Sequence, residues 1–144
     1  MEAVSRGEGR GEGVSARRLL WVGPLAVLAA VVVNLVIRTV AVAAFGLSGF
    51  LPLAVGPTVA FTVIGVVGAV VVFALIARFA RDPVRLFRRV AFVVLLLSLI
   101  PDLSLLITGS IPGTTVAGVL TLMAEHVATW AVSVVTLTTL AWRT

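Results

Sequence analysis

Long apolar runs, separated by short groups of Gly, Pro and Asp, dominate the chain. Each run is longer than the roughly eighteen residues that mark a membrane-spanning helix. Gly46 to Pro57, Asp82-Pro83 and Gly109 to Gly113 carry the residues that end helices. The pattern therefore predicts an all-α protein, an integral membrane four-helix bundle. We expect the spans at about 19–45, 57–79, 83–107 and 114–142.

The first sixteen residues differ from the rest of the chain. They are rich in Gly, mix acidic with basic residues and hold almost no large apolar side chains, so they cannot bury enough surface to become ordered. We expect a flexible tail at 1–16 and one transmembrane domain at 17–144. Asp82 is expected to cap the third helix, with Pro83 at its first helical position.

Composition supports a lipid environment. Of the 144 residues, 60% are hydrophobic and only 12% are charged, too few to coat a water-soluble globule. There is no cysteine, which excludes disulfides, thiolate metal sites and thiol nucleophiles. The net charge of +5 suggests nucleic acid binding in a soluble protein, but here the Arg residues flank apolar runs and indicate topology, so we expect no nucleic acid partner.

The arginines are distributed unevenly between the connections. Arg17 and Arg18 precede the first span, five Arg residues lie in the 78–89 connection, and Arg143 follows the last span. The other two connections carry no charge. Because basic connections stay on the cytoplasmic side, the pattern predicts a multi-pass protein of the cytoplasmic (inner) membrane with both termini in the cytoplasm.

Five polar residues interrupt the apolar runs: Asn34, Arg38, Asp102, Glu125 and His126. An unpaired charge in hydrocarbon is costly, so such residues normally face the bundle interior and find partners. The rise of a helix places Glu125 and His126 about 17 Å below Thr114, near the middle of the bilayer. We expect Arg38 to neutralise one acid, or to reach the interface, while the second acid and His126 share a proton.

Small and hydroxyl residues recur at helical spacing along each predicted span and form a stripe on one face. Examples are Ala26, Ala30, Asn34 and Arg38 in the first span and Thr58 and Thr62 in the second. Such stripes also form the ordinary contact faces of membrane helices. The candidate catalytic residues are Asp102, Glu125 and His126, and the candidate binding residues are Asn34, Arg38, Ser98, Thr129 and Trp130. A single His beside two carboxylates is weak support for a metal, so we predict no metal and no cofactor.

Three segments carry a family resemblance: FLPLAVGP at 50–57, PVRLFRRVAFVVLLLSLIPDL at 83–103, and MAEHVATWAVSV at 123–134. Together they resemble an uncharacterised family of small four-span membrane proteins from high-GC Gram-positive bacteria. The resemblance implies a four-helix membrane fold. It implies no activity and no active-site residues.

Three functions fit these residues, and they leave open whether the protein is an enzyme. We favour a membrane module that forms homo-oligomers or docks on a larger membrane protein, with the polar cluster inside it. One alternative is an enzyme for a lipophilic, isoprenoid-like small molecule, in which Asp102 or Glu125 donates a proton, His126 accepts one and Trp130 lines the pocket. The other is a proton- or cation-coupled transporter that works as a homo-oligomer. All three have the lipid bilayer as a partner.

Overall fold

The computed structural model describes residues 16–141. Residues 1–15 of the predicted tail and residues 142–144, with Arg143, lie outside the described residues. The elements are α1 (Ala16–Phe45), two 3-10 turns η1 (Leu47–Gly49) and η2 (Leu51–Leu53), α2 (Val55–Phe79), α3 (Pro83–Thr108) and α4 (Val116–Leu140). All four α-helices are long and apolar enough to cross a membrane, and residues 16–141 include no strand. The predicted all-α fold with four candidate spans is confirmed.

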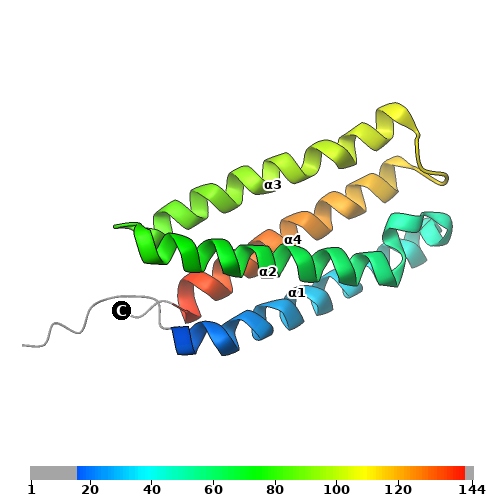
Figure 1. Ribbon diagram of the computed structural model, residues 1–144. Helices are drawn as coiled ribbons and strands as arrows, with labels where there is room; N and C mark the ends of the chain where they lie inside the picture. Colours follow the sequence, from blue (N-terminus) through cyan, green and yellow to red (C-terminus); the bar gives the residue numbers. More distant parts are fainter. Residues whose placement is uncertain (1–15, 142–144) are drawn as a thin grey trace, which may run out of the picture.

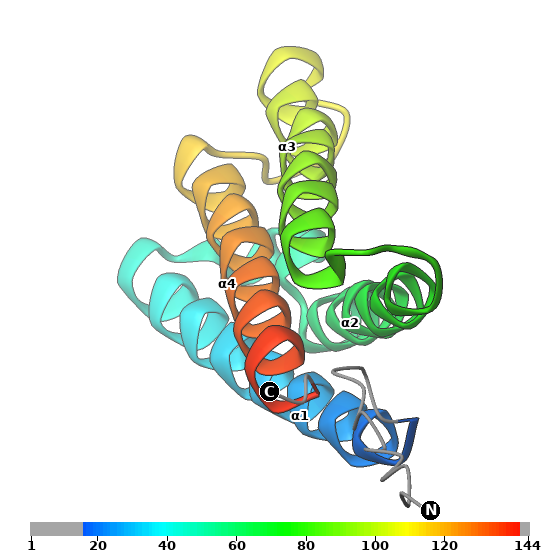
Figure 2. The same ribbon diagram turned by 90° about the vertical axis from the view of Figure 1, so that its left-hand side faces the viewer.

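The helices run up and down in chain order, as Figure 1 shows. One end of the bundle holds the start of α1, the α2–α3 connection and the end of α4. We call it the arginine end, because Arg17, Arg18 and the arginines of 78–89 lie there. The opposite end, formed by the connections 46–54 and 109–115, is the loop end. The most extensive packing is of α1 on α4 and α2, followed by α3 on α4, so α4 is the central helix (Figure 2).

Local residues set the helix ends. The Asp82 carboxylate accepts a hydrogen bond from the Arg85 backbone N–H at 3.2 Å, and Pro83 follows at the first helical position, which confirms the predicted cap. At its other end α3 stops at Gly109, whose φ of 57° is left-handed and suits glycine. Thr115 caps α4 by accepting from the Gly118 N–H at 3.0 Å. Capping residues therefore set these helix ends, close to the helix-breaking residues identified in the sequence.

Apolar side chains pack at three levels along the bundle. At the arginine end the Phe73 and Phe87 rings meet edge to face, with centroids 4.9 Å apart. In the middle Ala26 and Ala30 of α1 are fully buried beside Val66; their small size lets the helices approach closely. The loop-end cluster contains Ala41, Leu47, Phe50, Leu53 and Leu122. The small-residue stripe predicted on α1 thus faces the interior.

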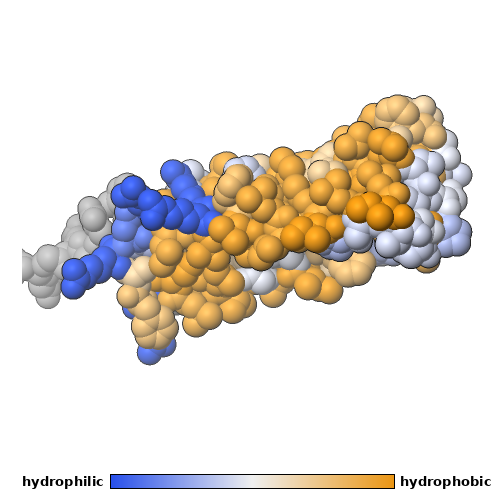
Figure 3. All heavy atoms as spheres, turned by 90° about the horizontal axis from the view of Figure 1, so that it is seen from above, coloured by the Kyte–Doolittle hydropathy of each residue, from blue (hydrophilic) through white to orange (hydrophobic). Residues whose placement is uncertain are grey.

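The outer surface of the bundle is apolar. Every helix exposes large hydrophobic side chains, including Leu28, Phe61, Ile100 and Leu120. Figure 3 shows hydrophobic residues along the length of the molecule and strongly hydrophilic residues gathered at one end. Among the four helices α3 buries the smallest share of its residues and α4 the largest. This distribution fits a multi-pass membrane protein whose lipid-facing surface is largest on α3.

Candidate functional site

The intramembrane polar residues form two groups. The first, the interior polar layer, is centred on Asn34 of α1, which is only 1% exposed. The Asn34 Nδ2 donates to the hydroxyls of Thr62 on α2 and Thr129 on α4, both at 2.8 Å. The Thr62 hydroxyl in turn donates to the Thr58 carbonyl at 2.6 Å. One amide therefore ties three helices together.

Replacing Asn34 with leucine, which has a similar volume, is expected to lower the free energy of unfolding by about 1–3 kcal/mol, because two interhelical bonds worth about 0.6–1.7 kcal/mol each are lost. Reversible SDS denaturation measures this loss. Thr39→Val on the same helix is the control, since the exposed Thr39 hydroxyl bonds only to the Leu35 carbonyl of its own helix. Equal losses in both variants would refute a special role for the layer.

The second group, the α3–α4 seam, consists of Asp102 and His126. The His126 Nδ1 lies 3.0 Å from Asp102 Oδ2 and 2.8 Å from the Leu122 carbonyl oxygen. A carbonyl oxygen can only accept, so Nδ1 carries a proton. The Leu122 carbonyl and the Asp102 carboxylate both lie within reach of that proton. The Asp102 side chain is 10% exposed and that of His126 is 39% exposed.

Pro101 directly precedes the acid of this seam. The α-helix continues through it to Thr108, although a proline has no N–H to donate to the carbonyl four residues earlier, at Leu97. On the opposite helix the Trp130 ring packs edge-on against Phe92 of α3, with centroids 6.2 Å apart. The indole therefore fills space between α3 and α4, one turn from His126.

Glu125 of α4 makes no hydrogen bond to either group within the described residues and is 7% exposed. The charges of His126, Arg38 and Asp102 are close enough to act on it electrostatically. Its Oε1 is buried without a hydrogen-bond partner among the described residues. Within residues 16–141, Asp102, Glu125 and His126 do not form a group that could hold a metal ion. Glu125 is thus the most weakly compensated acid in the bundle.

Arg38 binds the backbone instead of an acid. Its Nε donates to the Leu53 carbonyl oxygen at 2.5 Å, and no carboxylate of the described chain lies within 4 Å of it. A helix continuing through this point would use the N–H of Pro57, four residues after Leu53, but proline has none. The carbonyl is therefore free to accept from Arg38. The expected ion pair between Arg38 and an acid is not formed.

Several buried polar atoms have no hydrogen-bond partner within the described residues. Buried polar groups are nearly always paired, so each marks capacity for water or another polar group. The Ser98 hydroxyl, in contrast, is occupied by the Leu95 carbonyl of its own helix at 2.7 Å. The unpartnered atoms are Asn34 Oδ1, Thr58 Oγ1, Asp102 Oδ2, Glu125 Oε1, Trp130 Nε1 and Ser133 Oγ.

The structure thus brings Asn34 together with Thr129, and Asp102 with His126, while Ser98 joins neither group. Sequence reasoning did not select Thr62 as a site residue, although the spacing of Thr58 and Thr62 gave a signal. It had no signal for the carbonyls of Leu53 and Leu122, because backbone acceptors carry no sequence mark. These carbonyls hold Arg38 and His126 in place.

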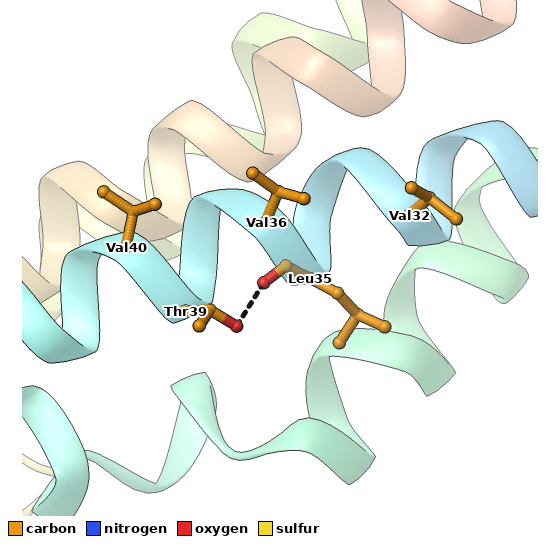
Figure 4. A pocket seen from close by; sticks show the side chains of 5 residues that line it. All are labelled: Val32, Leu35, Val36, Thr39 and Val40. Carbon is orange, nitrogen blue, oxygen red and sulfur yellow. Dashed lines mark hydrogen bonds between the residues drawn. The ribbon is translucent and has the colours of Figure 1, made fainter.

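A shallow hollow of about 340 Å³ lies on the surface of α1. Figure 4 shows that α1 alone supplies the five lining side chains. The Thr39 hydroxyl is turned back to the Leu35 carbonyl, at 2.6 Å. The hollow contains no candidate site residue and forms part of the apolar surface of α1. Its lining is Val32, Leu35, Val36, Thr39 and Val40.

Comparison with known proteins gives a family and no activity. The profile described as "Family of unknown function (DUF6069)" matches residues 14–143, and the chain belongs to this family. No curated protein and no solved structure matches the chain. The match includes all four helices and both polar groups. The protein is therefore a small multi-pass membrane protein of unknown activity, as predicted.

Proposed function

We propose that this member of the family is a non-catalytic membrane module that self-associates through the α3–α4 seam. The observation that carries the proposal is the 39% exposure of the His126 side chain. His126 lies ten residues into α4 (126 − 116), about 15 Å from its start. A polar imidazole exposed to hydrocarbon at this depth is unfavourable, and a hydrogen bond across helices relieves that cost.

A second copy of the chain is the partner that fits this surface. Association about a two-fold axis places the same face on both sides, so both imidazoles leave the lipid together. Exposed Ala124 and half-buried Ala128 lie on the same turns of α4 as His126, and small residues four apart allow close helix contact. The Nδ1 of His126 is already engaged, which leaves Nε2 for the partner.

The proposed location is the cytoplasmic membrane, with both termini in the cytoplasm. The support is the charge distribution. The arginines of 78–89 are all exposed, strongly hydrophilic residues gather at one end of the molecule (Figure 3), and the loop-end connections contain no charged residue. Basic residues are retained on the cytoplasmic side during insertion. The enzyme and transporter alternatives gain no support from the two surface hollows, since neither includes Asp102, Glu125 or His126.

Because the chain has no cysteine, a single introduced cysteine reports on this interface. We expect Val127→Cys, at a position 44% exposed beside His126, to form a disulfide-linked dimer on mild oxidation of native membranes. Val67→Cys is the matched control, since Val67 is 48% exposed near the middle of α2. It should crosslink at least several-fold less.

Adding His126→Leu to Val127→Cys should lower the dimer yield, because the polar group that drives association is lost. Similar crosslinking at positions 67 and 127 would indicate random collision and overturn the proposal. A crosslinked product heavier than a dimer of this chain, containing another protein, would replace self-association with docking on a larger partner.

A further inference from the structure

Two arginines and a surface hollow meet at the start of α3. Arg85 and Arg89 are one helical turn apart and both exposed. With Asp82 and Leu86 they line a hollow of about 310 Å³. The planar guanidinium group matches the geometry of a phosphate, which it binds through paired hydrogen bonds. The hollow therefore combines two phosphate-binding side chains with one apolar wall.

The hollow keeps a net positive charge, because two arginines and one acid, Asp82, line it. Asp82 is engaged as the helix cap, accepting from the Arg85 backbone N–H, and within the described chain no carboxylate lies within 4 Å of either guanidinium. Arg85 also lies in the first turn of α3, where the helix dipole disfavours cations and favours an anion. An anionic group in the hollow would reduce the repulsion between the two guanidinium groups and would also interact favourably with the helix dipole.

Below the arginines an exposed apolar track continues along α3. It follows steps of four and three residues from Arg89, the spacing of one helix face. This face is opposite the one that carries the buried Phe87, Leu95 and Asp102, so it points away from the bundle. The track consists of Val93 (53% exposed), Leu96 (49%), Ile100 (59%), Leu103 (45%) and Ile107 (87%).

We propose that this face of α3 is a binding site for one anionic phospholipid, with its phosphate between Arg85 and Arg89 and an acyl chain along Val93, Leu96 and Ile100. Ile100 is eleven residues beyond Arg89 (100 − 89), or about 16 Å, close to half the thickness of the hydrocarbon core. A lipid fits this order of charge followed by apolar surface better than a free anion, which uses only the hollow. The site is separate from the His126 seam and does not depend on self-association.

Native mass spectrometry of the full chain in mild detergent tests the proposal. We expect dipalmitoyl phosphatidylglycerol to be retained about tenfold or more tightly than phosphatidylcholine with the same acyl chains. The double variant Arg85→Gln/Arg89→Gln should lose about tenfold or more of this affinity. The matched control Arg78→Gln/Arg81→Gln removes the same charge from exposed arginines outside the hollow and should retain most of the affinity.

Equal weakening in both double variants would show diffuse charge attraction and overturn the site. Full competition by millimolar inorganic phosphate, or equal binding of a dihexanoyl phosphatidylglycerol, would show that only the phosphate is recognised and overturn the lipid assignment. Leu96→Ala/Ile100→Ala gives a second readout, because it should weaken binding of the long-chain lipid and leave that of the short-chain lipid unchanged. A melting temperature equal to that of the wild type establishes that each variant is folded.

Discussion

Replacing Gly118 with valine is expected to lower the free energy of unfolding by about 3 kcal/mol, because the site has no room for a side chain. A Cβ at this position would lie 2.9 Å from Cδ1 and 3.1 Å from Cε1 of Phe50, and 3.2 Å from the Thr115 hydroxyl. Phe50 is 2% exposed, so its ring cannot move aside without disturbing the loop-end cluster. Thr115 also caps α4 through the Gly118 N–H, and a shift of its side chain weakens that cap.

Gly68→Val is the matched control for this change. Gly68 lies within α2 and is exposed, and nothing stands within 4 Å of a Cβ built there. We expect Gly68→Val to change stability by less than about 1 kcal/mol. Reversible SDS denaturation of both variants in the same detergent gives the comparison. A Gly118→Val protein as stable as the wild type would show that Phe50 is not fixed in the loop-end core.

The loop end does more than connect helices. Its two connections touch closely: a Cβ added at Gly113, whose φ is +79°, would lie 3.1 Å from the Gly49 carbonyl oxygen. Leu53 in the first connection is 1% exposed and presents its carbonyl to Arg38. Packing of Phe50 against Gly118 therefore holds in place the backbone that receives the intramembrane arginine.

The fold follows from sequence features that act locally. The length and apolarity of each run determine how many spans form, and capping residues such as Asp82 and Gly109 determine where they end. On α1 the four-residue spacing of Ala26, Ala30 and Asn34 marks one face, and all three are buried. When small and polar residues form a single stripe on a helix, only that face can pack closely on neighbouring helices. The buried face of α1 was therefore predictable.

The division of the polar residues was not predictable in the same way. Helical rise gives the depth of Asn34, Glu125 and His126, but depth does not determine how each helix is rotated against the next. Neighbouring positions 125 and 126 point about 100° apart on α4, and packing buries Glu125 while it brings His126 to within 3.0 Å of Asp102. Arg38 donates to a backbone carbonyl in a 3-10 turn. A hydropathy profile identifies this segment only as a connection between two spans.

Replacing Arg38 with methionine is expected to lower the free energy of unfolding by about 2–4 kcal/mol. The change leaves the Leu53 carbonyl without its donor, at a cost of about 1–3 kcal/mol. It also removes the cation that acts electrostatically on the buried Glu125. We therefore expect Glu125→Gln to restore at least about 1 kcal/mol of the loss in the double variant, because the acid that loses its nearby cation is no longer ionisable.

The control for this cycle is Asp102→Asn in place of Glu125→Gln. Asp102 is the acid in contact with His126, so removing its charge should give no recovery in the Arg38→Met background and should add its own loss. Reversible SDS denaturation of the single and double variants yields both coupling energies. Strictly additive losses for Arg38 and Glu125 would show that Arg38 acts only through the Leu53 carbonyl. Coupling of Arg38 to Glu125 but not to Asp102 would instead show that the arginine stabilises the charge of Glu125 electrostatically, at a distance longer than that of an ion pair. His126 would then be the residue that stabilises Asp102.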